Sequence, residues 1–188
     1  MKTVLITILG VLTSLSVTAQ NVYTLNNESS TVVIKGTSSL HDWESKAETV
    51  EAELIGNLGE TSSIVNIKQL MLNIEVESIK SGKRIMDGKT FSALEGKKHP
   101  QIIFELSEII EVRQDSVFAS GVLTIAGKPQ TIELATAYQI QEDFSIKVTG
   151  TKDLLMSDFG IKPPKAMLGT LKTGDEIEIV FDVIFQKN

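Results

Sequence analysis

The sequence predicts an all-β domain, a single antiparallel β-barrel of about eight strands with one or two short helices. Apolar residues alternate with polar ones in several runs, which is the spacing at which successive side chains point to opposite faces of a strand. Gly, Pro, Asn and Ser residues that favour turns separate these runs. No stretch keeps a 3.6-residue period over a long helix, so a parallel sheet with crossover helices is not expected.

The first residues form a segment distinct from the rest. A positive charge at Lys2 precedes an almost uncharged apolar run over residues 4–17, and small residues up to Ala19 provide a cleavage site. The run is short for a membrane-spanning helix. We therefore expect residues 1–19 to be a secretory signal peptide, and residues 20–188 to form one domain in the periplasm or outside the cell.

Composition excludes several classes of function. The chain carries 18 Lys and Arg against 24 Asp and Glu, a net charge of −6, whereas general nucleic-acid binding needs basic patches. The absence of Cys excludes disulfides, thiolate chemistry and a lipid attached to an N-terminal Cys. Two His residues are too few for a His-rich metal site, and we expect no metal and no other cofactor.

Five segments show the alternation that predicts strands. Each places an apolar set of side chains on one face and a more polar set towards water. The segments cover residues 50–54, 70–77, 118–125, 132–140 and 176–185. Turn residues at 127–129 predict a tight hairpin that joins the strand ending at Ile125 to the one that includes Ile132.

The best helical candidate is short, from Ile85 to Leu94. Four of its side chains could share one side of the helix: Met86, Thr90, Phe91 and Leu94. Pro100 is expected to end this region before a strand begins at Gln101, because the residue before a proline avoids the helical conformation. His99 is expected to be exposed.

Apolar residues on both faces of some strands favour a barrel over a sandwich. Residues 117–125 and 180–185 show this pattern, so both faces of the sheet need to be covered or filled. A barrel of about eight strands can hold one small ligand. A sandwich with scattered apolar surface residues remains the alternative.

The segment from Ser38 to Glu44 places the only Trp beside a His and two carboxylates. His41 and Asp42 could act as a base and its orienting group, with Trp43 as a platform for a ligand. Adjacent strand residues point to opposite faces, however, so His41 and Asp42 would not meet there. We expect no catalytic residues, and pocket lining or core packing for His41 and Trp43.

A basic cluster over residues 83–89 lies beside the predicted helix. Lys83 and Arg84 could receive an anionic head group near the helix N-terminus. The alternative is a loop whose charges are simply solvated.

Ser157 and Asp158 raise the question of a hydrolase. Ser157 lacks the Gly-x-Ser-x-Gly turn of such enzymes, and no third partner is indicated. We expect instead a bent loop in which Phe159, Met167 and Leu168 seal one mouth of the barrel.

Six motifs occur in order between Tyr23 and Phe185. They cover residues 23–25 with 30–36, residues 40–43, residues 86–94 with 99–104, residues 119–127, residues 157–161 and residues 174–179. With these motifs the chain resembles the YceI-like polyisoprenoid-binding family, whose members are exported, lipocalin-like antiparallel β-barrels. The family often has Arg where this chain has Met156.

The resemblance implies an apolar channel for an isoprenoid chain, such as a quinone tail or a polyprenyl pyrophosphate, and no catalytic apparatus. Met156 in place of Arg favours a neutral quinone over a pyrophosphate head group. The residues expected near the ligand are His41, Trp43, Met86, Phe91, Phe159, Met167 and Leu168.

We therefore expect an exported, non-enzymatic protein that binds or transports an isoprenoid lipid or quinone. We expect no nucleic-acid partner and no stable membrane insertion, and a homodimer is left open. The alternatives are a structural or interaction β-domain without a ligand, and an enzyme that acts on a lipid through His41.

Overall fold

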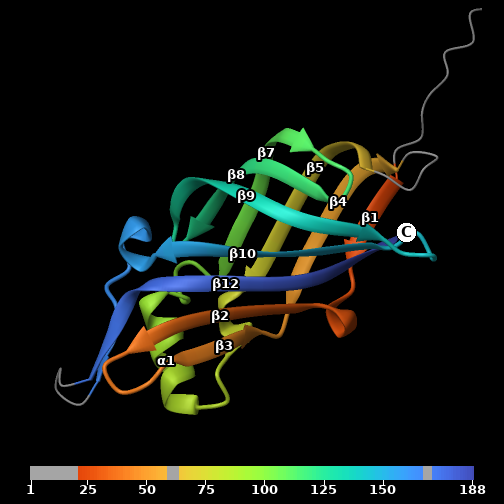
Figure 1. Cartoon of the computed structure of the whole chain (residues 1–188). Coiled ribbons are helices and arrows are strands. Elements are labelled where there is room, and N and C mark those ends of the chain that lie inside the picture. The colour runs from red at the N-terminus through yellow and green to blue at the C-terminus, as the bar shows by residue number, and fades with distance from the viewer. Residues whose placement is uncertain (1–20, 59–63, 167–170) are drawn as a thin grey trace, which may run out of the picture.

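The computed structural model describes residues 21–58, 64–166 and 171–188 and is built almost entirely of strands (Figure 1). The strands are β1 (Asn21–Leu25), β2 (Thr31–Ser38), β3 (Trp43–Ala47), β4 (Val50–Leu58), β5 (Ile64–Glu75), β6 (Ile79–Lys80), β7 (Gln101–Val112), β8 (Ser116–Ile125), β9 (Lys128–Ile140), β10 (Ile146–Leu155), β11 (Lys165–Ala166) and β12 (Leu171–Lys187). The helices are α1 (Arg84–Ala93) and the 3₁₀ turns η1 (Asn27–Ser29), η2 (Val76–Ser78) and η3 (Met156–Phe159). The expected signal peptide lies outside the described residues.

The strands close into an eight-stranded antiparallel barrel, as predicted. Neighbouring strands follow the order β1-β4-β5-β7-β8-β9-β10-β12, and β12 pairs back onto β1. β2 continues from β1 along the same edge of β12, and β3 and β6 extend the sheet beyond it. A two-sheet sandwich, the alternative left open by the sequence, does not form.

The predicted alternation agrees with the observed burial, and the predicted hairpin joins β8 to β9. Val50 and Leu54 of β4 are buried, whereas Glu51 and Glu53 between them are exposed. Ile125 pairs with Lys128 across a two-residue turn. Both turn residues, Ala126 and Gly127, have positive φ, which matches the twist of a tight hairpin.

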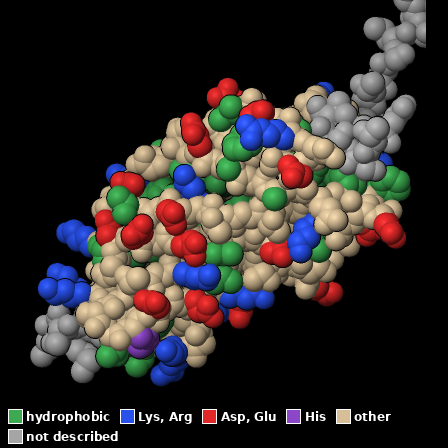
Figure 2. Space-filling model, viewed as in Figure 1, with side chains coloured by type: hydrophobic (Ala, Val, Ile, Leu, Met, Phe, Trp, Pro, Cys, Tyr) green, Lys and Arg blue, Asp and Glu red, His purple; other side chains and the backbone are tan. Residues whose placement is uncertain are grey.

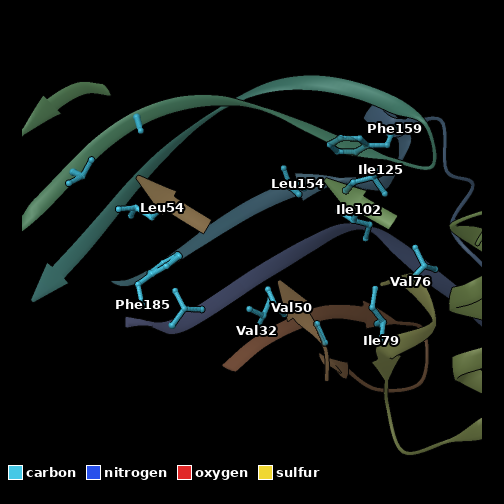
Figure 3. Close-up of a cluster of buried hydrophobic side chains, with 14 of the residues drawn as sticks. Val32, Val50, Leu54, Val76, Ile79, Ile102, Ile125, Leu154, Phe159 and Phe185 are labelled. Atoms are coloured by element: carbon cyan, nitrogen blue, oxygen red, sulfur yellow. The ribbon is translucent and has the colours of Figure 1, made fainter. Parts of the chain in front are cut away.

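The two ends of the barrel interior differ (Figure 3). At the end near β1, the side chains of Val32, Val50, Leu54 and Phe185 pack together, and Tyr23 is only 1% exposed. At the other end, beside α1, the buried side chains of Ile79, Ile102 and Ile125 line a cavity. Apolar burial at the first end stabilises the barrel by roughly 1.5–3 kcal/mol for each large side chain.

Helix α1 begins and ends one residue earlier than predicted, and β7 begins at Gln101 as expected. The expected exposure of His99 is wrong, because its ring packs over Gly127 and is half-buried. Gly127 has no side chain and leaves room for the ring. Among the described residues, no helix is both long enough and apolar enough to cross a membrane.

Three glycines allow aromatic rings to lie flat across neighbouring strands. The rings of Trp43, Phe104 and Phe181 occupy the space that a Cβ atom would need at Gly36, Gly121 and Gly150. Each ring comes from a strand paired with that of its glycine. In each contact the aromatic ring covers the backbone of the glycine, which has no side chain of its own to pack against its neighbours.

Gly121→Ala is expected to destabilise the barrel, because the added Cβ would lie 2.6 Å from the carbonyl oxygen of Glu105 and would also meet the Phe104 ring. The expected loss is about 1–3 kcal/mol, the usual cost of overpacking. Urea unfolding measures it.

Gly88→Ala in α1 is the matched control. A Cβ there meets nothing within 4 Å, so the same change should stabilise the protein by roughly 0.5–1 kcal/mol. Equal unfolding free energies for the two variants would contradict the packing described here.

Candidate binding cavity

A cavity of about 730 Å³ occupies the end of the barrel beside α1. The pairing of β5 with β7 ends at Glu75 and Gln101. The chain after β5 then forms β6, which pairs with β3 and not with β7. The connection from β6 to β7 is α1, so a helix takes the place of a strand pair at this end. This substitution leaves space that the side chains do not fill.

The wall of the cavity is mainly aliphatic. Its apolar residues come from β2, β3, β6, β7, β8, β12, α1 and the segment around η3: Ile34, Trp43, Ile79, Ile85, Met86, Ala93, Leu94, Ile102, Ile125, Met156, Phe159, Ile161, Pro164, Ile177 and Ile179. From Thr173 to Ile179 the lining follows β12 over six residues, a span of about 20 Å at the rise of a strand. A volume and lining of this kind are typical of sites for small apolar ligands.

The polar side chains that line the cavity are neutral or cationic. They are Ser38, His41, Ser45, Lys83, Arg84, Lys89, Thr90, Lys165 and Thr173. Within the described part of the chain, no Asp or Glu lines the cavity. An acidic protein therefore has a cavity whose charged groups are all cations.

Four of the seven residues predicted near a ligand line this cavity: His41, Trp43, Met86 and Phe159. Phe91 is not among the lining residues, because its ring packs over Gly96 and against the core. Met167 and Leu168 lie outside the described residues. The structure therefore brings together side chains from the β2–β3 loop, the start of β3, α1 and the 3₁₀ turn η3.

His41 and Trp43 have different roles in the wall. The His41 side chain is exposed at the rim, and its Nδ1 lies 2.6 Å from the carbonyl oxygen of Asp42. The Trp43 indole N–H donates to the carbonyl oxygen of Thr37 at 3.0 Å, and its ring covers Gly36. Trp43 is thus a fixed part of the wall, whereas His41 contacts backbone rather than a carboxylate.

Sequence reasoning missed most of the strand residues in the wall, including Ile34, Ile79, Ile125, Ile177 and Ile179. The alternation predicted that Ile125, Ile177 and Ile179 point inward. Inward residues fill the core at one end of the barrel and line free space at the other. No sequence signal distinguishes these two positions along a strand.

The η3 turn contributes Met156 and Phe159 to the wall, and polar contacts hold it in place. The backbone N–H and hydroxyl of Ser157 donate to the two carboxylate oxygens of Asp175, at 2.9 and 2.5 Å. Gln130 donates to the carbonyl oxygen of Asp158 at 2.7 Å. Ser157 and Asp158 therefore belong to a turn that is anchored on β12 through Asp175 and on β9 through Gln130.

Asp87 ties α1 to the loop before it. Its carboxylate accepts hydrogen bonds from the hydroxyl of Ser81 at 2.5 Å and from the backbone N–H of Ser81 at 2.8 Å. These bonds, with a smaller contribution from the charge of Lys80, hold the pKa of Asp87 below its ordinary value. The helix that covers the cavity is thus held by a charged side chain directed away from the cavity lining.

A second, shallower groove lies on the outer wall behind Trp43. Carboxylates of Asp42, Glu44 and Asp153 line it, together with Glu178, whose carboxylate lies 3.6 Å from the Lys35 ammonium. Within the described residues, no group of three or more His, Asp or Glu side chains is placed to hold a metal ion. The outer groove is therefore an acidic surface.

A closed antiparallel barrel with an apolar cavity at one end defines the lipocalin-like class of barrels. The chain belongs to the YceI-like family, whose domain model matches residues 23–185. This confirms the resemblance found in the sequence motifs. No curated protein sequence matches the chain.

Several solved structures are similar to this one. BcnA of Burkholderia cenocepacia has a TM-score of 0.70 at 17% identity, over 85% of this chain and 98% of that one. A polyisoprenoid-binding domain from Saccharophagus degradans, implicated in plant cell wall breakdown, has a TM-score of 0.71 at 14% identity, over 88% and 98%. The YceI protein of Campylobacter jejuni has 0.61 at 18% identity, over 77% and 84%. At these identities the likeness shows a shared fold.

Asp87→Asn is expected to loosen α1 and to flatten the dependence of stability on pH. Because the folded-state pKa of Asp87 lies below its ordinary value, the carboxylate stabilises the protein above about pH 4 and loses that effect as the pH falls through the folded-state pKa. Amide hydrogen exchange across residues 84–93, together with melting temperatures from about pH 7 to about pH 3, measures both effects.

Asp143→Asn is the matched control. The Ser145 side chain and backbone also lower the pKa of Asp143, but this pair lies in the β9–β10 turn at the opposite end of the barrel. Both variants should lose part of the acid dependence, and only Asp87→Asn should raise exchange in α1. Equal exchange in the two variants would show that Asp87 does not hold the helix.

Proposed function

We propose that this chain is an exported, non-enzymatic carrier that holds the apolar tail of an isoprenoid lipid in the cavity beside α1. The observation that carries the proposal is the cavity itself, about 730 Å³ of mainly aliphatic lining inside a closed barrel. An interaction domain without a ligand would have side chains packed through both ends. The filled end around Phe185 shows that this sequence can pack such a core where no cavity is needed.

Hydrophobic transfer alone supports binding of a long tail. Each CH₂ group moved out of water contributes roughly 0.8 kcal/mol, so about ten such groups contribute about 8 kcal/mol before ordering costs. Family membership and the similar fold of a domain described as polyisoprenoid-binding favour an isoprenoid tail over other apolar chains.

The wall around η3 favours a neutral head group close to the barrel interior. Met156 is buried there and lines the cavity, where the sequence motif of the family often has Arg. An apolar thioether offers no charge to a pyrophosphate. A quinone ring is neutral and could accept a hydrogen bond from a hydroxyl group such as that of Thr90, which also lines the cavity.

The arrangement around His41 favours carriage over catalysis. A general base needs an orienting group and a position beside the reacting atoms. His41 lies at the exposed rim, and its ring nitrogen contacts the carbonyl oxygen of Asp42 instead of a carboxylate. The signal peptide expected at residues 1–19 supports export to the periplasm or the medium.

Mass spectrometry of an organic extract from the natively purified protein tests the proposal directly. The expected result is a stoichiometric quinone or polyprenyl lipid. An empty extract, repeated after incubation with quinones and polyprenyl lipids of several chain lengths, would refute the carrier.

Ala93→Phe is expected to weaken binding of a long-chain quinone at least tenfold, because the added ring enters the cavity from α1. The emission of Trp43, the only Trp in the chain and part of the cavity wall, reports the titration. Ser92→Phe adds the same ring one residue away on the exposed side of α1 and should bind as the wild type does. Equal affinity in the two variants would place the ligand outside the cavity.

A further inference from the structure

The rim of the cavity combines exposed aliphatic side chains with cations. Leu40 in the β2–β3 loop is 70% exposed, and Ile85 in the first turn of α1 is 78% exposed. Ile85 lines the cavity directly, and Leu40 precedes His41, which also lines it. Most side chains this apolar are buried, so two on one rim at these exposures need an explanation.

Both aliphatic residues are held outward by ordered backbone. The Ser38 hydroxyl accepts from the N–H groups of Leu40 and His41 and donates to the carbonyl oxygen of His41. The backbone N–H of Ser39 donates to the carbonyl oxygen of Lys172 in β12, and the N–H of Lys172 donates to the Ser39 hydroxyl. The first turn of α1, which carries Ile85, is anchored by Asp87. The exposure of Leu40 and Ile85 is therefore built into the fold.

Four cations share this rim: Lys83, Arg84, Lys89 and Lys165. None of them forms an ion pair with a carboxylate of the described residues, whereas Lys35, Lys98, Arg113 and Lys147 elsewhere on the barrel do. The Lys89 ammonium donates to the carbonyl oxygen of Lys165 at 3.2 Å, which brings the helix and β11 together. These charges are free to attract an anionic partner.

Asp87 and Asp42 lie close to the rim residues in the sequence, and neither carboxylate forms an ion pair with a rim cation. Asp87 is directed to Ser81, and Asp42 lines the outer groove behind Trp43. Figure 2 shows hydrophobic, His and Lys or Arg side chains gathered at the lower end of the molecule, with Asp and Glu side chains spread along its side. The rim is thus the cationic and apolar end of a protein with a net charge of −6.

We propose that this rim docks on the surface of a bilayer that contains anionic phospholipid, with Leu40 and Ile85 inserted among the lipids and the four cations on the head groups. Aliphatic side chains flanked by Lys and Arg are the features that bind the interface of an anionic membrane. A soluble anion would use the cations and leave Leu40 exposed. Docking in this orientation turns the open end of the apolar cavity towards the lipid, so that a tail could pass between them without crossing water.

Sedimentation with vesicles tests the proposal. The vesicles are phosphatidylcholine alone, or phosphatidylcholine with phosphatidylglycerol in equal parts. Wild-type protein is expected to bind the mixed vesicles and to bind phosphatidylcholine at least tenfold more weakly. Removing Lys83 and Arg84 together (K83Q/R84Q) should weaken binding about twenty-five-fold, and added salt should weaken wild-type binding as well.

The apolar contribution has its own variant. L40S/I85S retains the rim cations, and it should lose most of its vesicle binding if the aliphatic side chains insert. Matched controls carry the same changes away from the rim. They are F144S/I110S, at exposed apolar positions, and K68Q/K187Q, at exposed cations without ion pairs in the described residues. Both controls should bind as the wild type does, and melting temperatures verify that every variant is folded.

Three results would overturn the docking surface. They are equal binding of the wild type to both vesicles or to neither, equal losses in rim and control variants, and complete release by free glycerol phosphate, which would indicate a site for a soluble anion. The inference partly rests on the carrier function, and the two can fail separately. An empty lipid extract refutes the carrier, whereas loss of preference for anionic vesicles refutes the docking.

Discussion

The structure depends on β12, which pairs along both of its edges. One edge bonds to β10 from Glu176 to Phe185, and the other bonds first to β2 and then to β1. The turn η1 between β1 and β2 is fixed on β12 through Ile184, whose N–H donates to the Ser30 hydroxyl and whose carbonyl oxygen accepts from the N–H of Asn26. These contacts satisfy the hydrogen bonds of what would otherwise be two free sheet edges, and so they close the barrel.

The cavity exists because strand pairing stops at one end of this barrel. The chain between β6 and β7 forms α1 instead of continuing the ladder, and a helix packs farther from its neighbours than a hydrogen-bonded strand does. The side chains that fill the space at the β1 end therefore cannot meet across the α1 end. Hydrogen bonds between Asp87 and Ser81 fix the first turns of α1. The position of the helix over the cavity therefore depends on polar contacts that lie outside the cavity.

Negative and positive side chains occupy different parts of the barrel. Carboxylates occupy the outer wall, where Asp42 and Glu44 line a groove and Glu178 pairs with Lys35, and none among the described residues lines the cavity. A buried carboxylate would be costly beside an apolar ligand, because its charge would lose hydration without a partner. Lys and Arg side chains can lie at the rim at little cost, because their long aliphatic stems cover apolar surface while their charges stay in water. An apolar cavity and a cationic rim are thus compatible parts of one site.

The sequence by itself determined the β class, five of the strand segments, the hairpin at Ala126 and Gly127, the helix and the family. These follow from local rules, since a period of two defines a strand and turn residues define where it ends. It also singled out His41, Trp43, Met86 and Phe159, through unusual residue types and motifs. Only the tertiary structure decided which inward-facing aliphatic residues pack as core and which line free space. Tyr23 and Ile125 both point inward, but the first lies at the filled end and the second in the cavity wall. That difference, like the packing of Phe91 over Gly96 and the exposure of Leu40 and Ile85 on one rim, depends on where barrel closure and α1 place each residue along the axis.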